Sequence, residues 1–332
     1  MPSARTTVTE LATGLGMLGF GDVDGALAAR PAAMVSVSPE LWHRLAEWRA
    51  GGGYDREFAA AFANGAAFLA AREGLRDRRP LAVEWKGSQR APGDEVAPID
   101  LRVDHVFLVS CKYLSKILAN ASPAHLFEDL LAGRHGHRRG DWYAEVAPAE
   151  LAGLYRSVRP LEPGLPQDVD NLSAPDRRLL ATALAGGWPD GAADLYAGLC
   201  RAVAARSADR WRSALARRDE HEPMLWRILR MGAAPYFVLG TTPRSLLRLR
   251  IATPWDWRQR YRLQAFEVCA QEGGQPRVGW RAGVRDLHRG TGLEIHGHVE
   301  IRWSHGRFCG PPEAKVYLDT AHEEVPGYVP LA

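Results

Sequence analysis

The chain has 332 residues, of which 46% are hydrophobic and 24% charged, and its formal net charge is +3. This composition is typical of a globular protein, excludes a disordered, collagen-like or coiled-coil chain, and at roughly 150 residues per domain favours about two domains. The apolar runs are far shorter than the ~20 residues of a membrane-spanning helix. The first residues lack the pattern of a secretory signal, and the four scattered cysteines form no CxxC pair. We therefore expect a cytoplasmic protein with reduced thiols and no membrane partner.

Helices are expected over the first ~75 residues. Residues 55–71 form an Ala-rich stretch in which Phe58, Phe62 and Phe68 are spaced to share one helix face. Three runs rich in strand formers follow, at 81–86, 99–103 and 106–113. A further helix is expected over 122–131, with Pro123 in its first turn. The predicted order is helix, three strands, helix.

Prolines cluster between residues 159 and 176, which predicts a linker between an N-terminal part (1–158) and a C-terminal part (177–332). Helices are expected from about 173 to 231, and strands from 236 to 328. The expected fold class is mixed α+β. An N-terminal α-β-β-β-α core at about 55–131 is followed by a helical segment and a C-terminal, mostly antiparallel β module.

The kind of positive charge is informative, because 38 of the 42 basic residues are Arg and only four are Lys. A Lys in such a chain is a candidate for a role that needs a compact ammonium whose pKa can shift. Three of the four follow an acid or a hydroxyl by two positions: Lys86 after Glu84, Lys112 after Ser110, and Lys315 after Glu313.

The helix-strand-strand-strand-helix order resembles the core of the PD-(D/E)xK, or restriction-endonuclease-like, nucleases. The residues behind the resemblance are Ile99-Asp100-Leu101 and Leu108-Val109-Ser110-Cys111-Lys112-Tyr113, and the match covers about a quarter of the chain. It implies hydrolysis of phosphodiester bonds, with Mg²⁺ or Mn²⁺ held by carboxylates and a Lys beside the scissile phosphate. It also implies nucleic acid, with DNA favoured, as partner, and a role in restriction, phage defence or DNA repair.

The position at which the family carries Asp or Glu holds Ser110, a poor metal ligand. We therefore expect Asp100 and Glu84 to hold the metal and Lys112 to lie beside the attacked phosphate, with Glu57 a more distant candidate. The alternative is a catalytically degenerate core in a nucleic-acid-binding or scaffold subunit of a multi-protein defence or repair system.

The turn between the second and third strands decides whether Asp100 belongs to this site. A three-residue turn is expected to place Asp100 opposite Leu108, on the face of Ser110 and Lys112, whereas a two-residue turn would place it on the other face. Asp104 is the weaker candidate, because eight strand residues at ~3.3 Å each separate it from Lys112 by about 26 Å.

Two further features suggest other sites. In the C-terminal strands, His296 and His298 would share one face and could bind zinc or manganese, and Glu313-Ala314-Lys315 is a second acid-x-Lys strand. The segment 254–262 interleaves aromatic residues with Arg, as nucleic-acid contacts often do. The expected nucleic-acid-binding residues are Lys86, Lys116, Arg258, Arg260 and Arg262.

Overall fold

The computed structural model describes residues 3–87, 99–113, 117–130, 140–216, 221–232, 234–241 and 246–332. The chain divides into two compact units. The first unit consists of Met1–Lys116, Arg230–Arg260 and His322–Ala332. The second unit consists of Ile117–Leu229 and Tyr261–Ala321, so the chain leaves the first unit and returns to it twice.

The first unit is built on a mixed sheet that has seven strands among the described residues, in the order β1-β2-β3-β4-β6-β7-β12. The strands are β1 (Met34–Val35), β2 (Val83–Trp85), β3 (Leu101–Val103), β4 (Phe107–Tyr113), β6 (Tyr236–Thr241), β7 (Leu246–Ile251) and β12 (Tyr328–Pro330). β2, β3 and β4 form an antiparallel meander, and β6 then pairs in parallel with β4. A segment from far along the chain therefore completes the centre of this sheet.

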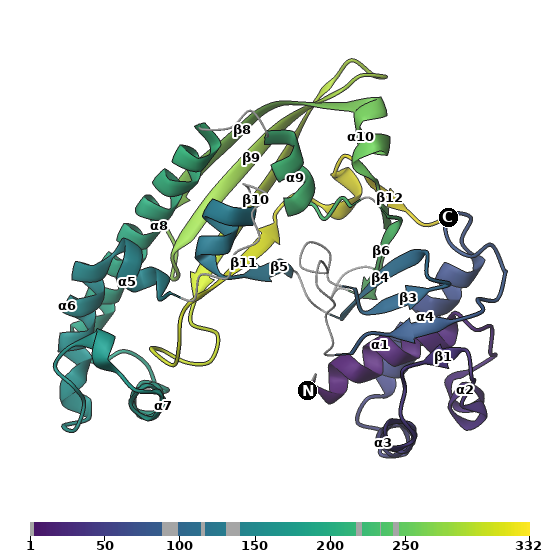
Figure 1. The fold of residues 1–332 in the computed structure, drawn as a ribbon, viewed down its shortest axis with the longest axis horizontal. Helices are drawn as coiled ribbons and strands as arrows, with labels where there is room; N and C mark the ends of the chain where they lie inside the picture. Colours follow the sequence, from purple (N-terminus) through teal and green to yellow (C-terminus); the bar gives the residue numbers. More distant parts are fainter. Residues whose placement is uncertain are drawn as a thin grey trace. The chain divides into compact units, whose positions relative to one another are not determined.

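Helices cover one face of this sheet (Figure 1). The helical elements of the first unit are α1 (Ala4–Gly16), α2 (Val23–Ala29), α3 (Pro39–Ala50), α4 (Asp55–Ala70), α10 (Pro254–Arg260) and η4 (His322–Glu324). α1 and α4 pack against each other and against the central strands. Phe58, Phe62 and Phe68 of α4 are all buried in the core, as their spacing predicts.

The same core contains Val109 and Cys111 of β4. Because successive side chains of a strand point to opposite faces, Ser110 and Lys112 belong to the face that α1 and α4 do not cover. This alternation separates an apolar face of β4 from a polar one.

The second unit combines an antiparallel sheet, in the order β5-β11-β10-β9-β8, with helices. Its strands are β5 (Ile117–Ala121), β8 (Tyr261–Gln271), β9 (Arg277–Asp286), β10 (Gly292–Arg302) and β11 (Glu313–Leu318). Its helical elements are η1 (His125–Leu130), α5 (Trp142–Val146), α6 (Pro148–Val158), η2 (Arg159–Leu161), η3 (Val169–Asn171), α7 (Ala174–Ala183), α8 (Ala192–Ala216) and α9 (His221–Ile228).

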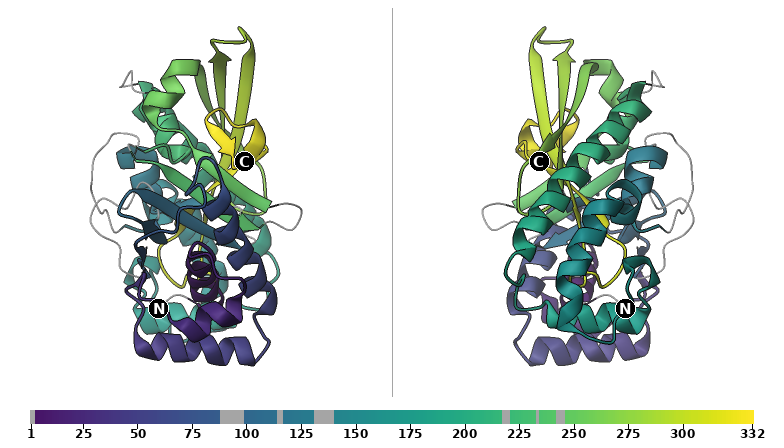
Figure 2. Two further views of the ribbon diagram at one scale, coloured as in Figure 1. Left: turned by 90° about the vertical axis from the view of Figure 1, so that its right-hand side faces the viewer. Right: turned by 90° about the vertical axis from the view of Figure 1, so that its left-hand side faces the viewer.

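The long helix α8 packs on β8 and β9, and the right-hand view of Figure 2 shows the teal helices of this unit in front of its sheet. Val278, Trp280 and Val284 of β9 are buried, whereas Arg281 and Arg285, at alternating positions of the same strand, are exposed. The sheet thus has an apolar face under helices and a polar face opposite.

The mixed α+β class with two sheets, one of them antiparallel, is confirmed. The division of the chain differs from the one expected from the prolines, because 159–176 lies inside the second unit and includes η2 and η3. The helix expected at 122–131 is represented by η1, which also belongs to the second unit. Among the described residues, no helix combines the length and apolarity needed to cross a membrane.

Candidate functional site

The hairpin between β3 and β4 determines where Asp100 lies. The two strands are joined by the three residues 104–106, of which Asp104 and His105 have left-handed φ values of 49° and 59°. Leu101 is paired with Val109 and Arg102 with Leu108. Asp100 is therefore next to Ser110, on the expected face, and the expectation that it lies opposite Leu108 is wrong by two residues.

Asp100 immediately precedes β3, and its side chain is bonded to β4. Its Oδ2 accepts a hydrogen bond from the Ser110 hydroxyl (3.1 Å) and another from the backbone N–H of Cys111 (2.6 Å). Ser110 is fully buried, so its hydroxyl is held in place beside this carboxylate. Among the described residues, Oδ1 of Asp100 has no hydrogen-bond partner. One oxygen of the Asp100 carboxylate is thus positioned by the protein.

Lys112 lies near the end of β4, among charges of both signs. Burial lowers the pKa of Lys112, the nearby positive charge of Arg230 lowers it further, and the carboxylates of Asp100 and Glu10 oppose this effect. Burial likewise raises the pKa of Cys111, and Asp100 and Glu10 add to that rise. Both acids therefore act on the same short stretch of β4.

Glu10 and Arg230 are the two members of this group that the sequence analysis missed. Glu10 is 6% exposed on α1, and its Oε2 accepts a hydrogen bond from Trp85 Nε1 (2.6 Å). Arg230 is 4% exposed and donates from Nη1 to the hydroxyl of Tyr236 (3.3 Å). Among the described residues, the buried Nε of Arg230 has no hydrogen-bond partner. A buried acid inside an apolar helical pattern is the signal that could have identified Glu10.

Glu84 takes part in a different set of contacts. Its side chain forms ion pairs with Lys86 (3.1 Å) and Arg102 (2.5 Å). Burial alone would raise the pKa of Glu84, but the hydrogen bonds and charges of these two cations outweigh it and hold the pKa below its usual value. The structure therefore pairs Glu84 with Lys86 and Arg102, whereas it groups Asp100 and Ser110 with Lys112.

Two other acids support the fold around this site. Asp104 accepts hydrogen bonds from the backbone N–H groups of Leu81 and Ala82, and it forms an ion pair with Arg78 (2.7 Å). These contacts fix the hairpin turn against the chain that enters β2. Glu57, on α4, is 6% exposed and forms an ion pair with Arg5.

The donor set of this group suits a hard cation. Mg²⁺ prefers oxygen ligands, keeps several waters and is often bound through one or two carboxylates. Asp100 supplies one carboxylate beside Ser110, and its Oδ1 has no partner among the described residues, whereas Glu10 extends from α1 and is bonded to Trp85. No cluster of three or more His, Cys, Asp or Glu side chains that could hold a metal is found in the part of the chain that the structure describes.

The expected nucleic-acid-binding residues are spread over both units. Arg258 and Arg260 lie on α10, where Trp257 is buried and Trp255 is 70% exposed, and Arg262 lies on β8. Arg258 and Arg262 are exposed and Arg260 is half-buried. Lys86 is paired with Glu84, as described above. Lys116 lies outside the described residues.

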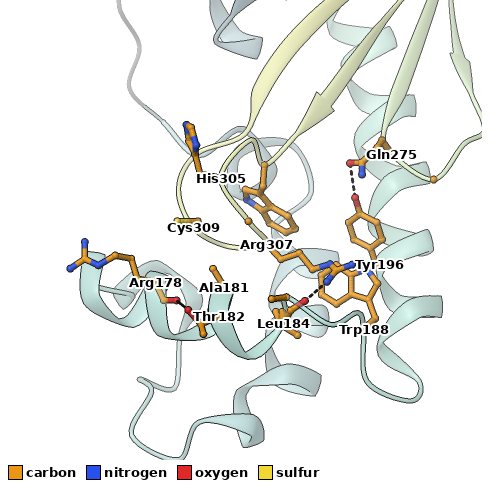
Figure 3. Close-up of a pocket in the computed structure, with 14 residues that line it drawn as sticks. Arg178, Ala181, Thr182, Leu184, Trp188, Tyr196, Gln275, His305, Arg307 and Cys309 are labelled. Carbon is orange, nitrogen blue, oxygen red and sulfur yellow. Dashed lines mark hydrogen bonds between the residues drawn. The ribbon is translucent and has the colours of Figure 1, made fainter. Parts of the chain in front are cut away.

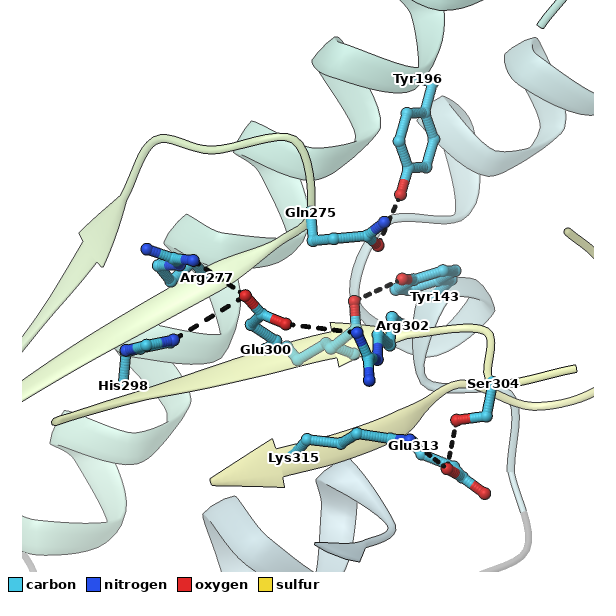
Figure 4. A network of polar contacts seen from close by, with 11 residues as sticks. Tyr143, Tyr196, Gln275, Arg277, His298, Glu300, Arg302, Ser304, Glu313 and Lys315 are labelled. Carbon is cyan, nitrogen blue, oxygen red and sulfur yellow. Dashed lines mark hydrogen bonds and ion pairs between the residues drawn. The ribbon is translucent and has the colours of Figure 1, made fainter. Parts of the chain in front are cut away.

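A second polar cluster lies on the polar face of the second sheet (Figure 4). Glu300 of β10 forms ion pairs with Arg277 (2.8 Å) and Arg302 (3.6 Å) and lies 3.8 Å from the ring of His298. On β11, Glu313 accepts from Ser304 and lies 3.5 Å from Lys315. In this cluster each acid has a basic neighbour, so its charges largely compensate one another.

The two histidines of β10 share a face, as their spacing predicts, but they contact different acids. His296 Nε2 lies 3.2 Å from Glu294, whereas His298 Nδ1 lies 2.8 Å from Asp319. His298 is buried and His296 is exposed. Each ring is thus oriented by its own carboxylate.

Comparison with models of known protein families gave no match, and neither curated proteins nor solved structures gave one.

Proposed function

We propose that the first unit is a metal-dependent nuclease, which hydrolyses phosphodiester bonds in nucleic acid with Asp100, Glu10 and Lys112 at its centre. The observation that carries the proposal is the group at the end of β4. Asp100 lies beside Ser110, on the face of β4 that also carries Lys112, and the charges of Arg230, Asp100 and Glu10 all act on Lys112. The buried Nε of Arg230 has no hydrogen-bond partner among the described residues. Phosphodiester hydrolysis needs both kinds of charge, carboxylates for the cation and positive groups for the phosphate.

The order of elements supports the same conclusion. α4 is followed by the meander β2-β3-β4, which has the helix-strand-strand-strand order on which the resemblance to PD-(D/E)xK nucleases rests. Asp100 precedes β3 and Lys112 lies on β4, in the positions that the resemblance assigns to a metal ligand and to the Lys. Ser110 takes the place of the family's second acid, and Glu10 replaces Glu84 as our candidate for the second carboxylate.

Each residue of the group has a separable task. Ser110 and the Cys111 N–H hold one oxygen of Asp100, so that the other is oriented toward a ligand. Asp100 and Glu10 would hold the divalent cation, which supplies activation of water and neutralisation of developing charge. The ammonium of Lys112 and the Nε–H of Arg230 would bind phosphate oxygens. A phosphate would also satisfy the buried donor of Arg230, which otherwise costs free energy.

The test is cleavage of plasmid and single-stranded DNA, and of RNA, by the full chain with Mg²⁺ or Mn²⁺. Lys112→Ala, Asp100→Asn and Glu10→Gln should each reduce cleavage by roughly 10²-fold or more, the loss typical of removing one group that stabilises a transition state. Glu84→Gln is the matched control, because it removes the charge of an acid on the same sheet. Circular dichroism should show that each variant is folded.

The outcomes discriminate between the candidate acids. Loss with Glu10→Gln and full activity with Glu84→Gln supports the proposal, whereas the reverse pattern returns the second metal ligand to Glu84. Cleavage that survives Asp100→Asn and Lys112→Ala would refute a site at β4. Binding of nucleic acid without cleavage under any condition would favour the alternative, a degenerate core in a binding or scaffold subunit, for which Ser110 at the acid position is the supporting observation.

A further inference from the structure

A cavity of about 760 Å³ lies within the second unit. It is lined by α7, the chain between α7 and α8, the start of α8, the turn between β8 and β9, and the connection between β10 and β11 (Figure 3). Small-molecule sites in proteins usually have volumes of roughly 300–1,000 Å³. None of the lining residues belongs to the first unit, so the cavity is distinct from the group at β4.

Aromatic rings form one part of the cavity wall. The rings of Trp188 and Tyr196 lie 4.7 Å apart, and the ring of Trp303 is stacked on that of Tyr196 at 6.3 Å. The Tyr196 hydroxyl donates to Oε1 of Gln275 (2.8 Å), which leaves the amide NH₂ of Gln275 to donate to a ligand. Flat aromatic ligands are held by such walls, through stacking and a small number of fixed polar groups.

The charged residues that line the cavity are all basic. They are Arg178, Arg307 and, when it is protonated, His305, and no Asp or Glu is among the lining residues. The guanidinium of Arg307 lies 4.6 Å from the ring centre of Trp188 and also donates to the carbonyl of Leu184. Within the described parts of the chain, neither Arg178 nor Arg307 forms an ion pair.

The lack of compensating acids contrasts with the polar sheet face of the same unit. There Arg277 and Arg302 share the carboxylate of Glu300. Two guanidiniums at one cavity without a carboxylate create a positive potential that favours an anion. A ligand suited to this cavity therefore combines a negative group with a flat aromatic one.

We infer that the cavity binds a nucleotide, whose base packs against the aromatic wall and whose phosphate is attracted by the basic residues that line the cavity. The nucleotide is either a free nucleoside phosphate or the phosphorylated terminal nucleotide of a strand, because both present the same base and phosphate. The inference does not depend on hydrolysis at the first unit, since it concerns binding by residues of the second unit alone.

The test is isothermal titration of the full chain with the four common nucleoside 5′-monophosphates, and with adenosine and inorganic phosphate as partial ligands. A second arm uses a short single-stranded oligonucleotide with and without a 5′-phosphate. Arg178 is exposed, so Arg178→Gln removes a charge without disturbing the fold. Arg285→Gln is the matched control, because Arg285 is an exposed Arg of β9 outside the cavity.

We expect at least one nucleotide to bind with a Kd below about 1 mM and adenosine to bind at least tenfold more weakly. Arg178→Gln and Arg307→Gln should each weaken binding about tenfold or more, as the loss of a charge-assisted hydrogen bond does, whereas Arg285→Gln should not. Binding confined to the phosphorylated oligonucleotide, with the same response to the variants, would identify the strand end as the source.

Two results would overturn the inference. One is the absence of binding by every nucleotide and by both oligonucleotides up to several millimolar. The other is binding that changes equally with Arg178→Gln and Arg285→Gln, because it would then depend on general positive charge and not on the cavity. Lys112→Ala should leave this binding unchanged even if it abolishes cleavage, so failure of the nuclease proposal is measured separately.

Discussion

The crossing of α1 and α4 allows a sharp prediction, because it depends on two glycines. A Cβ built on Gly65 would lie 2.0 Å from the carbonyl oxygen of Thr13, and one built on Gly16 would lie 2.1 Å from that of Phe62. Both obstacles are backbone atoms, so no side-chain rotation can relieve the contact. The substitution Gly65→Ala should therefore force the two helices apart.

The expected loss of stability combines two opposing effects. Ala is more favourable than Gly in a helix interior by about 1 kcal/mol. Overpacking a close contact costs about 1–3 kcal/mol, and a backbone clash belongs at the upper end of that range. We therefore expect Gly65→Ala to lower the free energy of unfolding by about 2 kcal/mol, which corresponds to a Tm decrease of about 4–8 °C for a domain of this size.

The assay is thermal unfolding followed by circular dichroism, with Gly198→Ala as the matched control. Gly198 is also inside a helix, α8, but a Cβ there would meet no atom within 4 Å. Gly198→Ala should therefore raise stability by up to about 1 kcal/mol. If Gly65→Ala were as stable as wild type or as Gly198→Ala, the close crossing of α1 and α4 would be refuted.

Burial raises the pKa of Cys200 to about 11 and that of Cys111 well above its usual value, whereas Cys269 is exposed. A thiol reagent at pH 8 should label Cys269 rapidly and Cys111 only after unfolding. Labelling is measured by mass spectrometry of peptides, and rapid labelling of Cys111 would contradict the prediction. The pKa of Glu84 is held below its usual value of 4.5, so its contribution to stability is complete above that pH and is lost as the pH falls through the lowered pKa. The stability difference between wild type and Glu84→Gln should therefore shrink in unfolding experiments below about pH 4.5, and a difference that grew on acidification would be inconsistent with the ion pairs. Finally, the buried indole N–H of Trp142 donates to Ser207 (2.9 Å). Ser207→Ala should therefore lower the free energy of unfolding, measured with denaturant, by about 1–3 kcal/mol. The loss should be clearly smaller in a Trp142→Phe background, which lacks the donor.

Local pattern was sufficient to predict much of the first unit. The Phe spacing of α4 places three rings in the core, and the strand-forming runs correspond to β2, β3 and β4. The side-chain alternation of β4 also predicts that Ser110 and Lys112 share a face. The turn length was open, because Asp104 and His105 suit either a two-residue or a three-residue connection; the three-residue turn places Asp100 beside Ser110.

The division of the chain into two units could not be predicted from local sequence patterns. β6 pairs with β4 across the whole 117–229 segment of the second unit, and β12 reaches the same sheet from the C-terminal end. The segments at which the chain passes between units carry no unusual composition, whereas the proline cluster at 159–176 is ordered within the second unit and includes η2 and η3. Long-range strand pairing, and not linker composition, determined the division.

Local patterns do not reveal contacts between distant segments, and this explains why the sequence indicated Glu84 and not Glu10. Glu84 precedes a Lys on a strand, which is a visible motif, but in the structure its charge is already compensated by Lys86 and Arg102. Glu10 interrupts an apolar helix, and its charge acts on the pKa values of Cys111 and Lys112 only once α1 is packed on the sheet. Glu10 and Arg230 are buried and Asp100 and Lys112 are half-buried, and charges in such positions stabilise a fold poorly, because the cost of desolvating them offsets their attraction. Arg230 even retains an N–H without a partner among the described residues. A charge group of this kind is easier to explain by a ligand that it binds than by the stability that it contributes, which supports the proposal of a site at the end of β4.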